Sequence, residues 1–198
     1  RRSPMGTSFA TKLRYYDIVN VNAGAGTIGY HKFGANCLYD PDLTGTGHQP
    51  RGFDQLMVMY NHYLVVGSKI TVTIHNSDAN IPVVAGVYTS VDTQTTTEPR
   101  DFMEQAGRKY TVLAGDSQGG SNIKTVTSYA SPKKMFNVTN LKDNTNLRGY
   151  VGANPTEVLY YNLFAFAQNE ASDPGAVDFS VVIDFLVVFS EPNDLDAS

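Results

Sequence analysis

The chain has 198 residues and a formal net charge of −4, and 41% of its residues are hydrophobic while 17% are charged. This length and composition allow one substantial buried core, and no change in composition marks a second domain. The single cysteine, Cys37, excludes an internal disulfide, no Cys/His cluster has the spacing of a zinc site, and no apolar run is long enough for a membrane-spanning helix.

The two ends of the chain differ from its middle. The sequence begins with Arg1-Arg2 and has no initiator Met, which predicts the end of a basic N-terminal arm over residues 1–11. A boundary produced by cloning or proteolysis is the alternative. Residues 191–198 are acidic and predict a solvated tail. The folded shell domain is therefore expected over residues 12–190.

Strand-forming residues dominate the middle, since the chain has twelve Tyr, ten Phe and frequent Val and Thr. Ile70, Val72 and Ile74 alternate with polar residues, as in a strand with one buried face. Comparable segments predict about eight strands, at residues 12–21, 63–75, 83–90, 110–114, 123–130, 135–138, 158–168 and 177–190. Long loops are expected at 22–52, 91–109, 115–122 and 139–157. The pattern favours an all-β fold, a single eight-stranded jelly-roll sandwich with long loops and one or two short helices.

Two of these segments allow a more specific prediction. Residues 177–190 are hydrophobic almost without a break, although Asp178 and Asp184 interrupt them. A strand of this kind is expected to pack on both sides or against a neighbouring subunit. Residues 52–62 predict a short helix with Asp54 as its N-cap, because unbranched apolar residues follow that aspartate.

Residues 115–119, Gly-Asp-Ser-Gln-Gly, match the G-x-S-x-G pattern of a serine hydrolase. An α/β-hydrolase places its histidine after the nucleophile, but all four histidines precede Ser117. The order of the chymotrypsin family is allowed, yet no histidine lies in that family's Ala-Ala-His-Cys setting, and Gln118 stands where the family has glycine. The segment suits a turn after the strand at 110–114. We therefore expect no enzyme.

Two other ligand patterns are weak. Residues 24–29 read G-x-G-x-x-G, but the sequence that follows does not continue as a helix, so no dinucleotide cofactor is expected. Asp40 and Asp42 flank Pro41 and could face a hard cation such as Ca²⁺, although the same residues are common in turns. No metal site is predicted, and Asp40 and Asp42 are only weak candidates.

The most specific stretch lies between residues 38 and 72. It contains Gly47-His48-Gln49-Pro50-Arg51-Gly52-Phe53-Asp54-Gln55, then Tyr60-x-x-Tyr63 and Gly67-Ser68-Lys69-Ile70. This block resembles the capsid proteins of small circular single-stranded DNA viruses that encode a replication-initiation protein, the circovirus-like viruses. In weaker form, residues 12–17 and 177–192 are similar to the first and last jelly-roll strands of that family.

The resemblance implies a structural viral protein. Copies of one jelly roll would assemble into the smallest icosahedral shell, of about sixty subunits, around a circular single-stranded DNA genome, with the basic arm pointing inward. The protein would belong to the virion, with assembly in the host cell nucleus and without a membrane. The sequence does not identify a host-cell receptor.

Two sets of residues are candidates for these contacts. Phosphate contacts to the genome are predicted at Arg1, Arg2, Lys12 and Arg14, and Lys133-Lys134 is a weaker candidate pair. Subunit contacts are predicted at Arg51, Phe53, Tyr39, Phe102 and Tyr150, which lie in or beside loops. A solvated basic face is the alternative for the first set, and packing within one subunit is the alternative for the second.

A secreted, oligomeric jelly-roll module that binds a carbohydrate or a receptor is the competing function. The glycosylation sequon Asn137-Val138-Thr139 and the many tyrosines favour it. The missing disulfides, the absence of Trp and the Arg1-Arg2 start count against it. A cupin-like enzyme ranks third, because the sequence has no His-x-His metal cluster.

Overall fold

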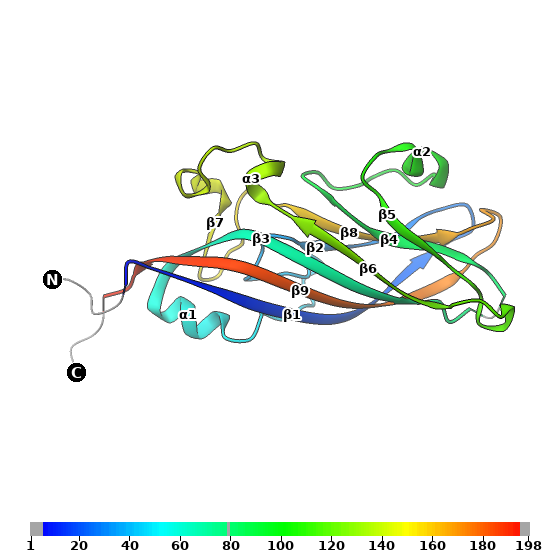
Figure 1. The fold of residues 1–198 in the computed structure, drawn as a ribbon, viewed down its shortest axis with the longest axis horizontal. Coiled ribbons are helices and arrows are strands. Elements are labelled where there is room, and N and C mark those ends of the chain that lie inside the picture. The colour runs from blue at the N-terminus through cyan, green and yellow to red at the C-terminus, as the bar shows by residue number, and fades with distance from the viewer. Residues whose placement is uncertain (1–5, 79, 195–198) are drawn as a thin grey trace.

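The computed structural model describes residues 6–78 and 80–194, and it consists of two β-sheets packed face to face (Figure 1). Sheet A contains, in spatial order, β1 (Ser8–Ala23), β9 (Gly175–Pro192), β3 (Tyr60–His75) and β6 (Ile123–Ala130), and the short β7 (Arg148–Tyr150) also pairs with β3. Sheet B contains, in order, β2 (Gly29–Gly34), β8 (Tyr160–Ala167), β4 (Val83–Ser90) and β5 (Lys109–Leu113).

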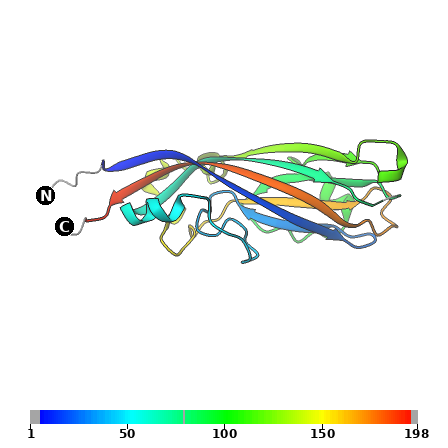
Figure 2. The same ribbon diagram turned by 90° about the horizontal axis from the view of Figure 1, so that it is seen from below.

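The path of the chain between these sheets is that of a jelly roll. Most successive strands cross from one sheet to the other, the exceptions being β4 to β5 and β6 to β7, and neighbouring strands in each sheet are antiparallel. The molecule is elongated, and the described ends of the chain lie side by side near α1 (Phe53–Met59), where Ser8 pairs with Ser190 (Figures 1 and 2). The predicted fold class, an all-β jelly roll, is confirmed.

The central strand β9 supplies the main stripe of the core. Between residues 177 and 189 its odd-numbered side chains face sheet B with no exposed surface: Val177, Phe179, Val181, Ile183, Phe185, Val187 and Phe189. Its even-numbered side chains point away from sheet B and are partly exposed, and Leu186 keeps 42% of its surface. Within the subunit the strand is therefore packed on one face only, so the expectation of packing on both sides within one subunit is wrong, whereas its alternative, packing against a neighbouring subunit, stays a prediction.

Both edges of β9 are hydrogen-bonded, to β1 on one side and to β3 on the other. The register shifts between Val65 and Gly67 of β3, which marks a β-bulge. Strand β1 begins at Ser8 rather than at residue 12, and β3 begins at Tyr60 rather than at residue 63. The alternation of side chains identified these strands, but it did not determine the residues at which they begin.

Three short α-helices lie in the connections of the described chain: α1, α2 (Pro99–Glu104) and α3 (Pro132–Met135). Helix α1 confirms the predicted helix, but its N-cap is Gly52, with a left-handed φ of 89°, and Asp54 lies in the first turn. Helix α2 places Phe102 against the outer side of sheet B, where its ring lies 4.7 Å from that of Phe164.

Three local predictions were wrong. No strand forms at residues 135–138: Met135 ends α3, which Pro132 opens at a position that needs no backbone N–H, and a turn follows at residues 136 and 137. Strands β2 and β7 lie in segments that were expected to be loops. Three 3-10 turns also occupy predicted loops, at Asp116–Gln118, Leu141–Asp143 and Thr145–Leu147.

The one-sided burial of β9 predicts a sharp contrast between two neighbouring residues. Phe185→Ala should lower the free energy of unfolding by about 3–5 kcal/mol, because it empties space in the sealed core. Leu186→Ala should cost about 1 kcal/mol or less, because that side chain is partly in water. Urea unfolding followed by circular dichroism measures both. Equal losses for the two variants would show that the outer face of β9 is also packed.

Buried tyrosines predict a loss of stability at high pH. Burial raises the pKa of Tyr63 and Tyr161 above the ordinary value of 10.0, and it raises the pKa of Tyr30 to about 12. Because each folded-state pKa lies above the unfolded value, the stabilisation is complete below about pH 10 and is lost as the pH rises further. Urea unfolding between pH 8 and pH 11 measures it.

The matched variants separate this effect from other titrations. Combining Tyr63→Phe with Tyr161→Phe should flatten the decline between pH 10 and pH 11, whereas Tyr129→Phe should not, because Tyr129 is 65% exposed. The same decline in both backgrounds would assign the loss of stability to other groups.

Candidate functional site

Sheet A turns one face away from the core, and the two basic residues predicted in β1 lie on it. Leu13 and Tyr15 point inward and are buried, so Lys12 and Arg14 point outward and are exposed. The other predicted nucleic-acid residues, Arg1 and Arg2, lie outside the described residues. Contact of any of these four residues with a genome stays a prediction.

The strand register continues a charged row from Arg14 across sheet A. Arg14 of β1 lies opposite Asp184 of β9, which lies opposite Lys69 of β3, which in turn lies opposite Tyr129 of β6. The Arg14 guanidinium donates two hydrogen bonds to the Asp184 carboxylate, Nε to Oδ1 at 2.6 Å and Nη2 to Oδ2 at 3.0 Å. Such a bidentate pair fixes the orientation of the guanidinium.

A groove of about 850 Å³ opens along this row. Gly67 has no side chain at the bulge of β3, and α3 stands beside it, so the sheet surface is hollow between α3 and β1. Four cationic side chains and one carboxylate line it, a net charge of +3. We call this feature the cationic groove and define it by Lys12, Arg14, Lys69, Lys134, Asp184 and Tyr129.

Lys69, Asp184 and Tyr129 were not predicted as site residues, and Lys134 was only a secondary candidate for genome contact. Lys69 occupies an outward position in a predicted strand, which indicated its exposure but not its neighbours. Lys134 lies on α3, directly before the strand that the sequence predicted at residues 135–138. Tyr129 becomes relevant only through its register with Lys69. The register between distant strands is therefore the information that sequence reasoning lacked.

The predicted subunit contacts divide into two groups. Tyr39 and Tyr150 keep 39% and 52% of their surfaces exposed, and Arg51 is exposed as well. Phe53 and Phe102 have no exposed surface. The ring of Phe53 lies edge-on to that of Tyr63 at 5.4 Å, and Phe102 packs in the cluster over sheet B. The fold uses these two phenylalanines in its own packing, so neither side chain is free to contact a neighbour.

Tyr39 and Tyr150 belong to segments that the fold holds together. The backbone N–H of Asp40 donates to the Asn154 side chain at 3.1 Å, and the Asn154 amide donates back to the Asp40 carbonyl at 3.0 Å. Tyr150 and Ala153 are joined by two backbone hydrogen bonds that close a tight turn. The two exposed tyrosines therefore come from one anchored loop region.

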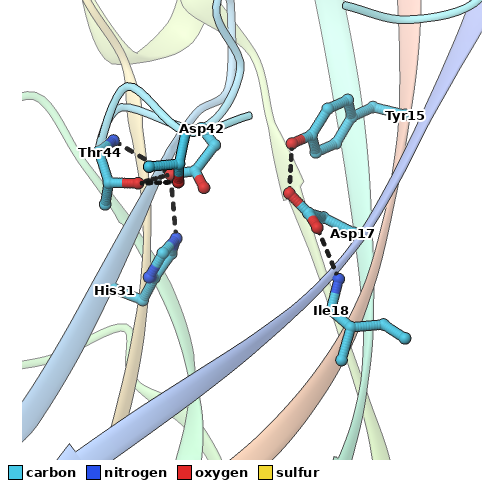
Figure 3. Close-up of polar contacts among 7 residues, drawn as sticks. Tyr15, Asp17, Ile18, His31, Asp42 and Thr44 are labelled. Carbon is cyan, nitrogen blue, oxygen red and sulfur yellow. Dashed lines mark hydrogen bonds and ion pairs between the residues drawn. The ribbon is translucent and has the colours of Figure 1, made fainter. Parts of the chain in front are cut away.

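The carboxylate of Asp42, a weak metal candidate, holds its own loop in place through polar contacts (Figure 3). Its Oδ1 lies 3.0 Å from Nε2 of His31 and accepts hydrogen bonds from the backbone N–H and the hydroxyl of Thr44, at 3.0 and 2.9 Å. Burial and the nearby Asp42 charge raise the pKa of Asp40. Within residues 6–78 and 80–194, no group of three or more His, Cys, Asp or Glu side chains could hold a metal ion.

Figure 3 also shows a second carboxylate that works within the fold. The Tyr15 hydroxyl donates to Oδ2 of Asp17 at 2.6 Å, and Oδ1 of Asp17 accepts from the backbone N–H of Ile18 at 2.8 Å. Burial, followed by this hydrogen bond, raises the pKa of Tyr15. Both oxygens of Asp17 are therefore engaged on the same face of β1 as Tyr15, opposite to the outward face of Lys12 and Arg14.

The hydrolase-like segment forms a turn. Ser117 lies in a 3-10 turn between β5 and β6, and its hydroxyl donates to the Asn80 side chain at 3.0 Å. Residues 24–29 run from a loop into β2, which is antiparallel to its partner β8, so no βαβ unit surrounds them. None of the described helices is long and apolar enough to span a membrane.

No family model and no curated protein matches the chain by sequence. Solved structures do match. They include the giant freshwater prawn (Macrobrachium rosenbergii) nodavirus semi-empty virus-like particle, with a TM-score of 0.52, 13% identity and coverage of 98% of this chain and 100% of that chain. Mud crab tombus-like virus matches with a TM-score of 0.49, 15% identity and coverage of 98% and 96%. The BFDV capsid protein in its 60-mer form matches with a TM-score of 0.45, 12% identity and coverage of 98% and 100%.

These similar structures are virus particles and capsid proteins, and the nodavirus match covers both chains almost completely. At these identities the likeness is one of fold. The chain therefore has the jelly-roll fold that is found in the nodavirus virus-like particle.

Proposed function

We propose that the chain is a structural capsid subunit that assembles with copies of itself into a small icosahedral shell around a circular single-stranded DNA genome. The observation that carries this proposal is the end-to-end match of the fold to the chain of a virus-like particle. The sequence block between residues 47 and 72 supports the narrower assignment to circovirus-like viruses. A shell of about sixty copies is the simplest closed assembly for one such subunit.

Exposed apolar residues on the loops support self-assembly. A subunit that contacts several neighbours needs apolar contact surfaces outside its core. Beyond Tyr39 and Tyr150, Val151 is 66% exposed in the same loop region, and Val58 of α1 is 75% exposed. Together with Arg51, these residues are the proposed contacts between subunits.

The two sheet faces differ in a way that suggests an orientation in the shell. The segment of α2 covers part of the outer side of sheet B through Phe102, whereas sheet A has an open outer face with the cationic groove. A basic surface of this kind attracts the phosphates of a nucleic-acid backbone. We therefore place the outer face of sheet A toward the genome, with the proposed basic arm preceding β1, which begins at Ser8, and entering the interior beside it.

Mass photometry with negative-stain electron microscopy tests the assembly. The chain should be compared in two forms, as it stands and with an Arg-rich N-terminal extension. Sixty copies of a 21.6 kDa chain give uniform round particles of about 1.3 MDa. Only monomers to trimers, in both forms and across pH and salt, would overturn the capsid proposal and favour a small binding module.

Substitutions in the loop region test the proposed contacts. Tyr39→Ser and Tyr150→Ser should each raise the protein concentration needed for assembly by at least about tenfold, because buried aromatic anchors contribute strongly to interfaces. Tyr16→Ser is the matched control, since Tyr16 is 50% exposed but lies on the face assigned to the interior. Loss of assembly in the Tyr16 variant alone would reverse the assignment of the two surfaces.

A further inference from the structure

We propose that the cationic groove binds a segment of single-stranded nucleic acid, with its phosphates on the lysines and Arg14 and a base stacked on Tyr129. This inference rests on the proposed function, because it names a place on the folded domain where a packaged strand would be held. It differs from binding by the N-terminal arm, since the groove is formed by the sheet itself.

The charge of the groove is the first argument. The whole chain carries a net charge of −4, yet the groove combines four cations with one carboxylate. The one carboxylate, Asp184, is bonded to Arg14 and lies opposite Lys69 in the register. Positive charge concentrated in this way on an acidic domain indicates a polyanionic partner.

Tyr129 is the second argument, because it distinguishes a nucleic acid from a simple polyanion. Its ring is 65% exposed on β6, and the ammonium groups of Lys69 and Lys109 each lie 5.7 Å from the ring centroid. Proteins that bind single strands combine cations for the backbone with aromatic rings on which bases stack. A sulfated glycan offers the same anionic charge but no base to stack.

The shape of the groove favours a single strand. Its volume of about 850 Å³ lies within the range of small-ligand sites, which suits one or a few nucleotides rather than a duplex. Gly67 leaves part of the hollow open, since a Cβ atom built there would meet only the Ala130 carbonyl oxygen, at 3.5 Å. A larger side chain at this position can therefore fill the groove without changing its charge.

Fluorescence anisotropy with a fluorescein-labelled oligo-dT of about 12 nucleotides tests the proposal on the 198-residue chain. Protein concentrations are kept below those at which particles form, as checked by mass photometry. Lys134→Gln should weaken binding and reduce the slope of log affinity against log salt by about 0.7, the share of one phosphate contact. Lys133→Gln is the matched control, because Lys133 is exposed on the same helix but does not line the groove.

Two further kinds of variant complete the test: one removes the ring of Tyr129, and the other fills the groove at Gly67. Tyr129→Ala should lower the affinity about tenfold, whereas Tyr110→Ala, at an exposed tyrosine of β5, should leave it unchanged. Gly67→Leu should weaken binding with a normal thermal unfolding curve. Arg1 and Arg2 are present in every variant, so their contribution cancels in these comparisons.

Three outcomes would overturn the inference. The first is equal salt slopes for the Lys134 and Lys133 variants, and the second is unchanged affinity in Tyr129→Ala. The third is tighter binding of a heparin fragment that is insensitive to Tyr129→Ala, which would identify a sulfated glycan as the ligand. Particle assembly is measured separately, so the groove can fail while the capsid proposal stands, and the reverse can also occur.

Discussion

The pairing of β9 with both β1 and β3 is the constraint on which the rest of the structure depends. Seven fully buried side chains on one face of β9 anchor sheet A to sheet B, and a shift of the strand by one residue would turn this whole stripe toward water. The same register fixes what lies on the other face. Arg14, Asp184 and Lys69 meet in one row because the core stripe leaves them no other position.

Polar bonds fix the long connections in the way that apolar packing fixes the strands. Asn36, which is almost fully buried, accepts from the backbone N–H of Leu159 at 2.8 Å and donates to the carbonyl of Glu157 at 2.8 Å. Tyr63 accepts a hydrogen bond at its hydroxyl from the backbone N–H of Leu38 at 3.2 Å. A buried polar group that loses such a partner costs about 1–3 kcal/mol. These bonds therefore anchor the loop that presents Tyr39 to the body of the domain.

The sequence predicted the long strands and the fold class because alternation and β-branched residues are local signals. It missed β2, whose six residues include His31 and Lys32, because contacts with residues elsewhere in the sequence stabilise this strand. These contacts are the pairing with β8 and the interaction of His31 with Asp42. The candidate site was half predicted. Lys12 and Arg14, and Lys134 as a weaker candidate, were identified from charge, but Lys69, Asp184 and Tyr129 required the strand register. Burial, which also depends on distant partners, distinguishes Phe53 and Phe102 from Tyr39 and Tyr150.

A cryo-EM reconstruction of particles assembled with a single-stranded DNA circle would test the orientation of the subunit most directly. The account predicts that the outer face of sheet A lines the interior, with extra density beside Tyr129 and Lys134, and that neighbouring subunits meet through the loops of Tyr39 and Tyr150. A shell in which sheet A faces the outside, or in which that face is buried between subunits, would contradict it.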